Sequence, residues 1–198
     1  GKELADKNHV IENFNMSENK AGAKDDGLGV YVTAGKAQET DAGLQIKLVI
    51  HNQTTNPPRF MSDMKVRYYF NISEQLAKGE DISYIETRID YDQEKSFTDG
   101  KNQATISEPV KYDDKGTYYI EISWQNCNFY GSRVYQCGLL NKMNETTYDT
   151  GWDSSNDYSY SDLTSFEDDN DAAAVTKKVT AYVDGDLVWG VEPDGTTP

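Results

Sequence analysis

Apolar and polar side chains alternate along most of the chain after residue 28. A period of two is typical of β-strands, because successive side chains of a strand point to opposite faces of the sheet. Gly, Asn and Asp residues separate the alternating segments, and Asp184-Gly185 predicts a tight hairpin turn within the last one. The segments that we predict as strands lie at 27–35, 44–52, 64–72, 83–93, 116–124, 129–140 and 177–191.

Strands of this length and spacing, with no convincing amphipathic helix between them, indicate an all-β sandwich. The segment 72–81 could hold one helical turn, and 171–175 could hold another. We expect residues 1–27, which are polar and weakly patterned, to form a linker or an N-terminal arm. Residues 28–195 would form the module, and residues 196–198 would begin a C-terminal linker.

The chain is strongly acidic, with 34 Asp and Glu against 19 Lys and Arg and a formal net charge of −15. This charge argues against nucleic acids and anionic membranes as partners, because both bind cationic surfaces. No apolar run approaches the roughly 18 residues that cross a membrane. The first ten residues contain no apolar signal-peptide core, so a secreted protein would have its signal upstream of them.

Few residues suggest metal-thiolate or catalytic chemistry. The two histidines, His9 and His51, belong to no ligand-like cluster, which argues against zinc. Cys127 and Cys137 flank a Gly-Ser turn, and their spacing is compatible with a disulfide or with two buried thiols. Nothing marks a pair of carboxyl groups with the unequal environments that a glycosidase needs, so we expect no enzyme activity.

Four segments give the chain a family resemblance. They are KVRYYFNISE, GTYYIEISW, WDSSNDYSYSDL and VTAYVDGDLVWGVEP. In this order and at this spacing they resemble a family 3 carbohydrate-binding module, over about Val30 to Gly195. NISEQLAKGEDISYIETRIDYDQ, HNQTTNPPRF and the pair Trp152-Asp153 look like the subgroup fused to family 9 glycoside hydrolases, whereas the closing strand looks like the scaffold-borne members.

The resemblance implies a jelly-roll sandwich of about nine strands with a structural calcium ion. Calcium binds six to eight oxygen atoms, and two stretches of this chain match the family's ligand positions. The alternative is that Asn156 and Asp157 only cap a turn, as such residues often do. The expected ligands are Asn71, Ser73, Glu74, Asp153, Asn156 and Asp157.

The resemblance also implies a flat carbohydrate-binding face. The family's Trp-Cys-Asp-His-like segment is replaced here by residues 80–88, and Leu139 stands at the position of the strip arginine. Alternation along 83–93 places Ile85, Thr87, Ile89 and Tyr91 on one face, and Glu86, Arg88, Asp90 and Asp92 on the other. The expected contacts are therefore polar, and the alternative is a merely solvated strand face. They are Glu86, Arg88, Asp90, Asp92, Gln93, Arg133 and Tyr135.

The family's second surface is a shallow groove on the opposite side. The resemblance assigns to it Arg67, Tyr69, Tyr119 and Tyr158, and the alternative is that these tyrosines pack beneath a surface loop. As a whole, the sequence predicts a non-catalytic, extracellular module that binds cellulose or a related β-glucan, in the same polypeptide as a catalytic glycoside hydrolase domain. Two alternatives remain: an accessory domain that docks on a family 9 catalytic domain and changes its processivity, and a linker-binding protein module.

Overall fold

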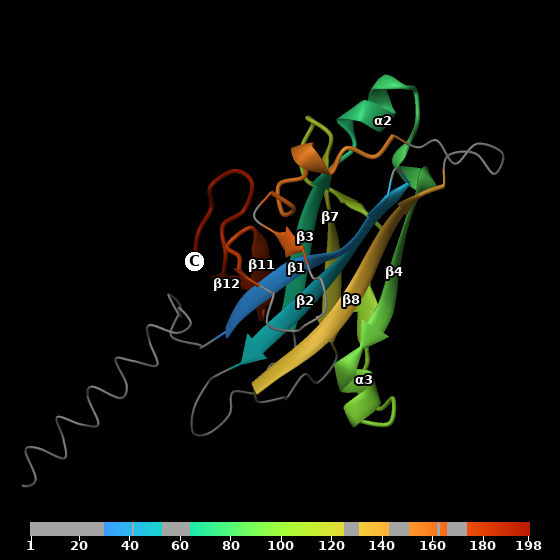
Figure 1. The fold of residues 1–198 in the computed structure, drawn as a ribbon. Coiled ribbons are helices and arrows are strands. Elements are labelled where there is room, and N and C mark those ends of the chain that lie inside the picture. The colour runs from blue at the N-terminus through green and yellow to red at the C-terminus, as the bar shows by residue number, and fades with distance from the viewer. Residues whose placement is uncertain are drawn as a thin grey trace, which may run out of the picture.

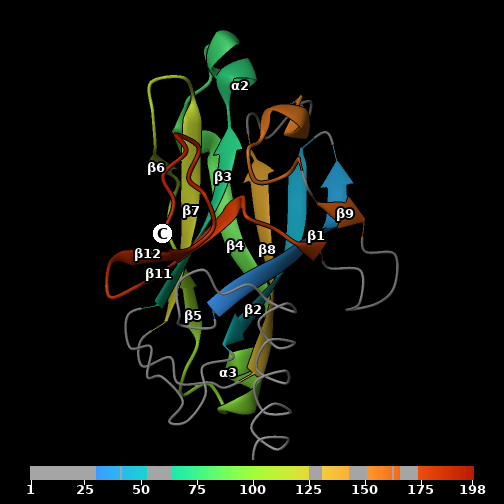
Figure 2. The same cartoon turned by 90° about the vertical axis from the view of Figure 1, so that its left-hand side faces the viewer.

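The computed structural model describes residues 30–40, 42–52, 64–124, 131–142, 151–161, 163–165 and 174–198. These residues form two sheets that face each other as a sandwich (Figures 1 and 2). The first sheet has the strand order β10-β1-β2-β8-β4, with β9 parallel to β1. The second has the order β12-β11-β3-β7-β5, with β6 beside β7. The all-β sandwich predicted from the sequence is confirmed.

Most of the long strands fall where the alternation predicts them. The strands of the first sheet are β1 (Val30–Thr40), β2 (Gly43–Asn52), β4 (Ile85–Asp92), β8 (Gly131–Asn141), β9 (Thr164–Ser165) and β10 (Ala174–Val175). Those of the second are β3 (Met64–Asn71), β5 (Ala104–Ile106), β6 (Val110–Lys111), β7 (Thr117–Trp124), β11 (Val179–Val183) and β12 (Asp186–Trp189). The described residues thus hold more strands than the expected nine, because β5, β6, β9 and β10 are too short to show as alternating segments.

Helical turns are few in the described part of the chain. The α2 helix (Ser73–Ala77) lies at one end of the sandwich and α3 (Gln93–Phe97) at the other (Figures 1 and 2). Single 3₁₀ turns are formed by η1 (Ile82–Tyr84) and η2 (Ser154–Asn156). The turn predicted over 72–81 is confirmed. The one predicted over 171–175 is wrong at its end, because Ala174 and Val175 pair with β1 as a strand.

The core lies between the two sheets and is built from one face of each strand. Ile46, Leu48 and Ile50 of β2 face Val66, Tyr68 and Phe70 of β3 across it, and all are fully buried. The last two strands turn at Asp184-Gly185, where both residues have positive φ as a tight hairpin requires. The predicted hairpin is therefore confirmed.

A β-bulge interrupts β4 where it pairs with β8. Ile89 lies opposite Cys137, but the next paired residue is Tyr91, which lies opposite Gln136, so Asp90 is the additional residue. A one-residue shift exchanges the two faces of a strand from that point on. The alternation predicted Tyr91 inward and Asp92 outward, and both predictions are wrong: Tyr91 is 41 % exposed, whereas Asp92 is buried.

Candidate functional site

The outer face of the first sheet, the side turned away from the core, is broad and polar over β2, β8 and β4. Gln45 and Arg88 lie on either side of Gly138 in the register, and Lys47 and Tyr91 lie on either side of Gln136. We call this surface, formed by Gln45, Lys47, Arg88, Asp90, Tyr91 and Gln136, the outer face.

Three polar side chains that are joined by hydrogen bonds cross the middle of the outer face. Asp90 accepts a hydrogen bond from Arg88 Nε at 2.7 Å and another from Gln45 Nε2 at 2.5 Å. A side chain at Gly138 would crowd this arrangement, because a Cβ there would lie 3.0 Å from Arg88 Nε and 3.2 Å from Asp90 Oδ2. The Arg88 and Asp90 side chains therefore lie directly over β8 at Gly138.

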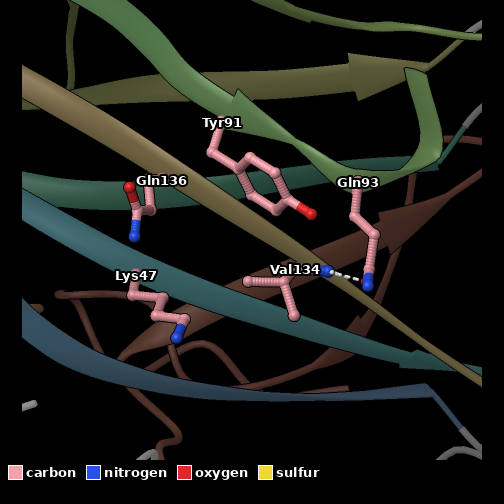
Figure 3. A pocket seen from close by; sticks show the side chains of 5 residues that line it. All are labelled: Lys47, Tyr91, Gln93, Val134 and Gln136. Carbon is pink, nitrogen blue, oxygen red and sulfur yellow. Dashed lines mark hydrogen bonds between the residues drawn. The ribbon is translucent and has the colours of Figure 1, made fainter. Parts of the chain in front are cut away.

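Tyr91 borders a hollow of about 250 Å³ in the outer face. Figure 3 shows the tyrosine ring from β4 beside Gln136 and Val134 of β8, with Lys47 of β2 beyond them. Gln93 closes one end, where its Oε1 accepts the Val134 backbone N–H at 2.9 Å. The hollow thus combines an exposed aromatic ring with amide and ammonium groups. Polar groups of this kind hydrogen-bond hydroxyl-rich ligands.

Four of the seven predicted flat-face residues lie on or beside the outer face, and three do not. Glu86 forms an ion pair with Lys142, Arg88 and Asp90 cross Gly138, and Gln93 borders the hollow. Asp92 instead caps α3, accepting the N–H groups of Lys95 and Ala104 at 2.9 and 2.7 Å.

The two predicted contacts on β8 lie on its other face. Arg133 forms an ion pair with the buried Glu94, and Tyr135 is fully buried with its ring 5.0 Å from that of Trp124. Both predictions that these residues lie on the flat face are wrong, because Gln136, Val134 and Gly138 occupy the outward positions of β8. The positions of Tyr91, Lys47, Gln45 and Gln136 on the outer face were not predicted from the sequence. Nothing local in the sequence marks the bulge that exposes Tyr91.

The two stretches expected to bind calcium come together at the end of β3. Asp157 Oδ1 accepts the Asn71 N–H at 2.7 Å, and Glu74 Oε2 accepts Asn156 Nδ2 at 2.8 Å. Glu74 Oε1 also accepts the Asp153 N–H at 3.2 Å. Ser73 is exposed and donates its N–H to Asn71 Oδ1 at 2.8 Å. The spatial proximity of the two stretches follows the prediction, and the ion itself stays a prediction.

The charges at this position favour a cation. Burial raises the pKa of Asp157 to about 8, against the opposing hydrogen bonds from Asn71 and Trp152, and the nearby Glu74 and Asp153 carboxylates raise it further. A cation would relieve this crowding of negative charge. In the described part of the chain no three His, Cys, Asp or Glu side chains form a metal cluster by themselves. The residues present fit calcium, which binds both carboxylate and amide oxygens. Asn71 and Asn156 would add amide oxygens to the nearby carboxylates.

The four predicted groove residues lie together on the outer side of the second sheet. The Arg67 guanidinium carbon is 4.5 Å from the centre of the Tyr119 ring, and Tyr69 lies edge-on to Tyr158 at 6.0 Å. The chain's own C-terminal residues lie against them: the Tyr158 hydroxyl donates to Val191 O at 3.0 Å, and the Tyr69 hydroxyl donates to Glu192 Oε1 at 3.4 Å. Tyr69 is fully buried, so it acts here as a packing residue.

Comparison with known proteins places this sandwich in a family. The model of the cellulose binding domain family CBM_3 matches residues 30–190, which include both sheets. The chain belongs to this family. The resemblance to a family 3 carbohydrate-binding module is thereby confirmed. Membership of the subgroup fused to family 9 hydrolases stays a prediction.

Relatives of this cellulose binding domain include endoglucanase A of Bacillus pumilus, which is 28% identical over 168 residues. That match covers 83% of this chain and 23% of the relative, so the chain spans about a quarter of that protein. Among solved structures, endoglucanase CelQ from Clostridium thermocellum complexed with cellotriose aligns with a TM-score of 0.69 at 24% identity, over 84% of this chain and 26% of that one.

A second solved structure is an isolated domain. The CBM3a-L domain with flanking linkers from scaffoldin cipA of the Clostridium thermocellum cellulosome aligns with a TM-score of 0.60 at 20% identity, over 87% of this chain and 95% of that one. At these identities the two structures support the fold of the cellulose binding domain. None of the helices in the described part of this domain is long and apolar enough to span a membrane.

Proposed function

We propose that this cellulose binding domain is the non-catalytic module of an extracellular cellulase or cellulosome component, and that it binds β-glucan on the outer face around Tyr91. The observation that supports this site is the exposed Tyr91 ring beside a hollow bordered by Lys47, Gln93 and Gln136. A pyranose ring has an apolar face that packs on an aromatic ring, and its hydroxyls bind amides and charged groups. The outer face offers both kinds of partner within one surface.

The preferred substrate under this proposal is a loosened glucan chain rather than a crystal surface. A crystal presents many parallel chains, and strong adsorption to it needs several coplanar rings. All three tryptophans of the chain, Trp124, Trp152 and Trp189, are buried in the core and cannot stack on sugars. Contact with the outer face therefore depends on Tyr91 and on hydrogen bonds, which favours weak, reversible binding.

A second candidate is an accessory domain that docks on a family 9 catalytic domain in the same polypeptide and changes its processivity. Two observations favour it: the buried tryptophans, and the alignment of this chain with about a quarter of the CelQ endoglucanase chain. In this case the isolated module would bind little glucan by itself. The two candidates differ in whether the outer face has measurable affinity without a catalytic partner.

We further propose that a calcium ion ties the β3–α2 corner to the η2 turn. Asn71, Glu74, Asp153, Asn156 and Asp157 would hold it, and Ser73 would contribute at most its hydroxyl. Bound calcium would supply the positive charge that the buried Asp157 lacks in its surroundings. Its role would be structural, because these residues lie on the second sheet's end and not on the outer face.

Affinity electrophoresis in gels that contain hydroxyethylcellulose tests the site. Migration of the unmodified chain should be retarded, and Tyr91→Ala should lose most of this retardation, whereas Tyr84→Ala should keep it. Tyr84 is a matched control because it is equally exposed but precedes β4 and borders none of the outer-face hollow. Equal retardation of all three proteins would place the glucan site elsewhere, and no retardation of any would favour the accessory domain.

A further inference from the structure

A second hollow adjoins the outer face at the end of β4. It has a volume of about 290 Å³ and lies between the end of β4, the helix α3 and the start of β5. Two residues of the outer face, Asp90 and Tyr91, border it, and Tyr91 also borders the hollow beside Gln136. The two hollows therefore meet at the Tyr91 side chain. We call the second one the side hollow.

The pairing of the strands leads from the outer face toward the side hollow. Lys47 of β2 pairs with Gln136 of β8, and Gln136 pairs with Tyr91 of β4, so the three residues form a row across the strands. The row ends at Tyr91, because β4 is the last strand of the first sheet, and the side hollow lies next to this end. Neighbouring strands are about 4.8 Å apart, which makes the row about 10 Å long. A longer glucan that follows the row extends past Tyr91.

The side hollow offers polar groups that the protein itself does not use. Lys95 of α3 and Gln103, just before β5, border it and are exposed. Within the described residues, no hydrogen bond or ion pair occupies the Lys95 ammonium or the Gln103 side-chain amide. An ammonium group only donates hydrogen bonds, whereas an amide both donates and accepts them. Together they match sugar hydroxyls, which also do both.

The other residues of the side hollow favour a neutral ligand. Its two carboxylates, Asp90 and Asp92, each accept two hydrogen bonds from within the protein, so they do not form an open cation site. The same carboxylates make the hollow a poor place for an anion. Ile89 and Ala104 add apolar surface. A neutral ring with an apolar face and hydroxyls at its rim fits this combination.

We propose that the side hollow is an end subsite for the glucan, in which Lys95 and Gln103 hydrogen-bond the sugar that follows the one stacked on Tyr91. This inference rests on the proposed function of the outer face and adds a specificity to it. A chain long enough to cover the row and enter the side hollow gains contacts that a short oligosaccharide does not make. The domain should therefore prefer longer glucan chains.

Titration calorimetry with cello-oligosaccharides of two lengths tests the subsite in the full chain. The unmodified protein should bind cellohexaose more tightly than cellotriose, because the shorter ligand is held by Tyr91 and covers only the row. The double variant Lys95→Ala/Gln103→Ala should weaken cellohexaose binding by about tenfold, as expected for the loss of two ordinary hydrogen bonds. It should bind cellotriose as the unmodified protein does.

Two further variants separate the subsite from the outer face. Lys101→Ala removes the same charge from an exposed position that borders neither hollow, and it should change neither affinity. Tyr91→Ala should weaken the binding of both ligands. If the double variant binds both ligands as the unmodified protein does, or loses affinity equally for both, the end subsite is refuted, and a loss in Tyr91→Ala still supports the outer face. If the unmodified protein binds neither ligand, or Tyr91→Ala changes neither affinity, the outer-face proposal fails and the subsite fails with it.

Discussion

Tyr91 lies directly opposite Gln136 of the neighbouring strand, although two residues earlier Ile89 lies opposite Cys137. Three residues of β4 thus span two of β8, and the bulge turns the Tyr91 ring from the core to the outer face. Bulges re-aim side chains in this way next to binding sites in many β-proteins. In this molecule the bulge provides the aromatic ring on which the proposed glucan contact depends.

Calcium should stabilise the protein, and Asp157 should be required for the effect. We expect calcium added to protein treated with EDTA to raise the melting temperature. At a hundredfold excess over the dissociation constant the free energy of unfolding should rise by about 2.7 kcal/mol. Asp157→Asn, which keeps the shape of the side chain, should abolish most of this rise. The measurement is calorimetry with and without EDTA.

Asp186→Asn is the control for this experiment, because Asp186 is exposed in β12 and far in sequence from the proposed ligands. It should respond to calcium as the unmodified chain does. Identical melting temperatures of the unmodified chain with EDTA and with calcium would contradict the metal site, and the turn-capping role of Asn156 and Asp157 would then be preferred.

His51 should make the fold less stable in mild acid. Its ring stacks on Tyr31 with 4.1 Å between centres, and burial lowers the pKa of His51 from 6.5 to about 4. Between these values the unfolded chain binds a proton that the folded chain does not, so the free energy of unfolding decreases as the pH falls from about 6.5 to about 4. The loss should be about 2 kcal/mol, after a reduction for the part of the ring that solvent reaches.

Urea denaturation at pH 7 and pH 4.5 measures this effect. Carboxyl groups also titrate near the lower pH, so the informative quantity is the difference between the unmodified chain and His51→Gln. The variant should lose less stability on acidification than the unmodified chain. An equal loss in both proteins would mean that His51 does not carry the pH dependence.

Glu192 should hold the C-terminal residues against the second sheet. Its carboxylate accepts a hydrogen bond from the Tyr182 hydroxyl and lies 3.7 Å from Arg67 Nη1. Removing it with Glu192→Ala leaves Tyr182 and Arg67 without this acceptor, so we expect the free energy of unfolding to fall by about 1–3 kcal/mol. Chemical denaturation measures the change, and an effect no larger than that of the exposed control Asp186→Ala would show that the C-terminal residues contribute no stability here.

The sequence predicted the strands better than the side-chain directions at the site. Alternation located the long strands, and the family resemblance brought Asn71 and Asp157 together although they lie 86 positions apart. The segment from Ile85 to Asp92 alternates without a break, so it contains no sign of the bulge at Asp90. The bulge depends on how β4 pairs with β8. These two strands are distant in the sequence, so their pairing cannot be read from the local pattern of residues.

The positions of Arg133 and Phe97 were unpredictable for a similar reason. Arg133 pairs with Glu94, which is 39 positions away and sits on a helix that the alternation did not predict. Only the folded chain shows that this pair lies beneath Phe97. The predicted arm at 1–27, Cys127 and residues 53–60 of the segment HNQTTNPPRF lie outside the described residues, so the expectations for them stay predictions.

Depletion of the unmodified chain from solution by insoluble cellulose tests the central claim most directly. We predict clear depletion on phosphoric-acid-swollen cellulose, where loosened chains are accessible, and weaker depletion on microcrystalline cellulose. Tyr91→Ala should reduce the first while the chain stays folded, because Tyr91 is not part of the buried core. No depletion on either material, with the chain folded, would contradict an autonomous glucan-binding face.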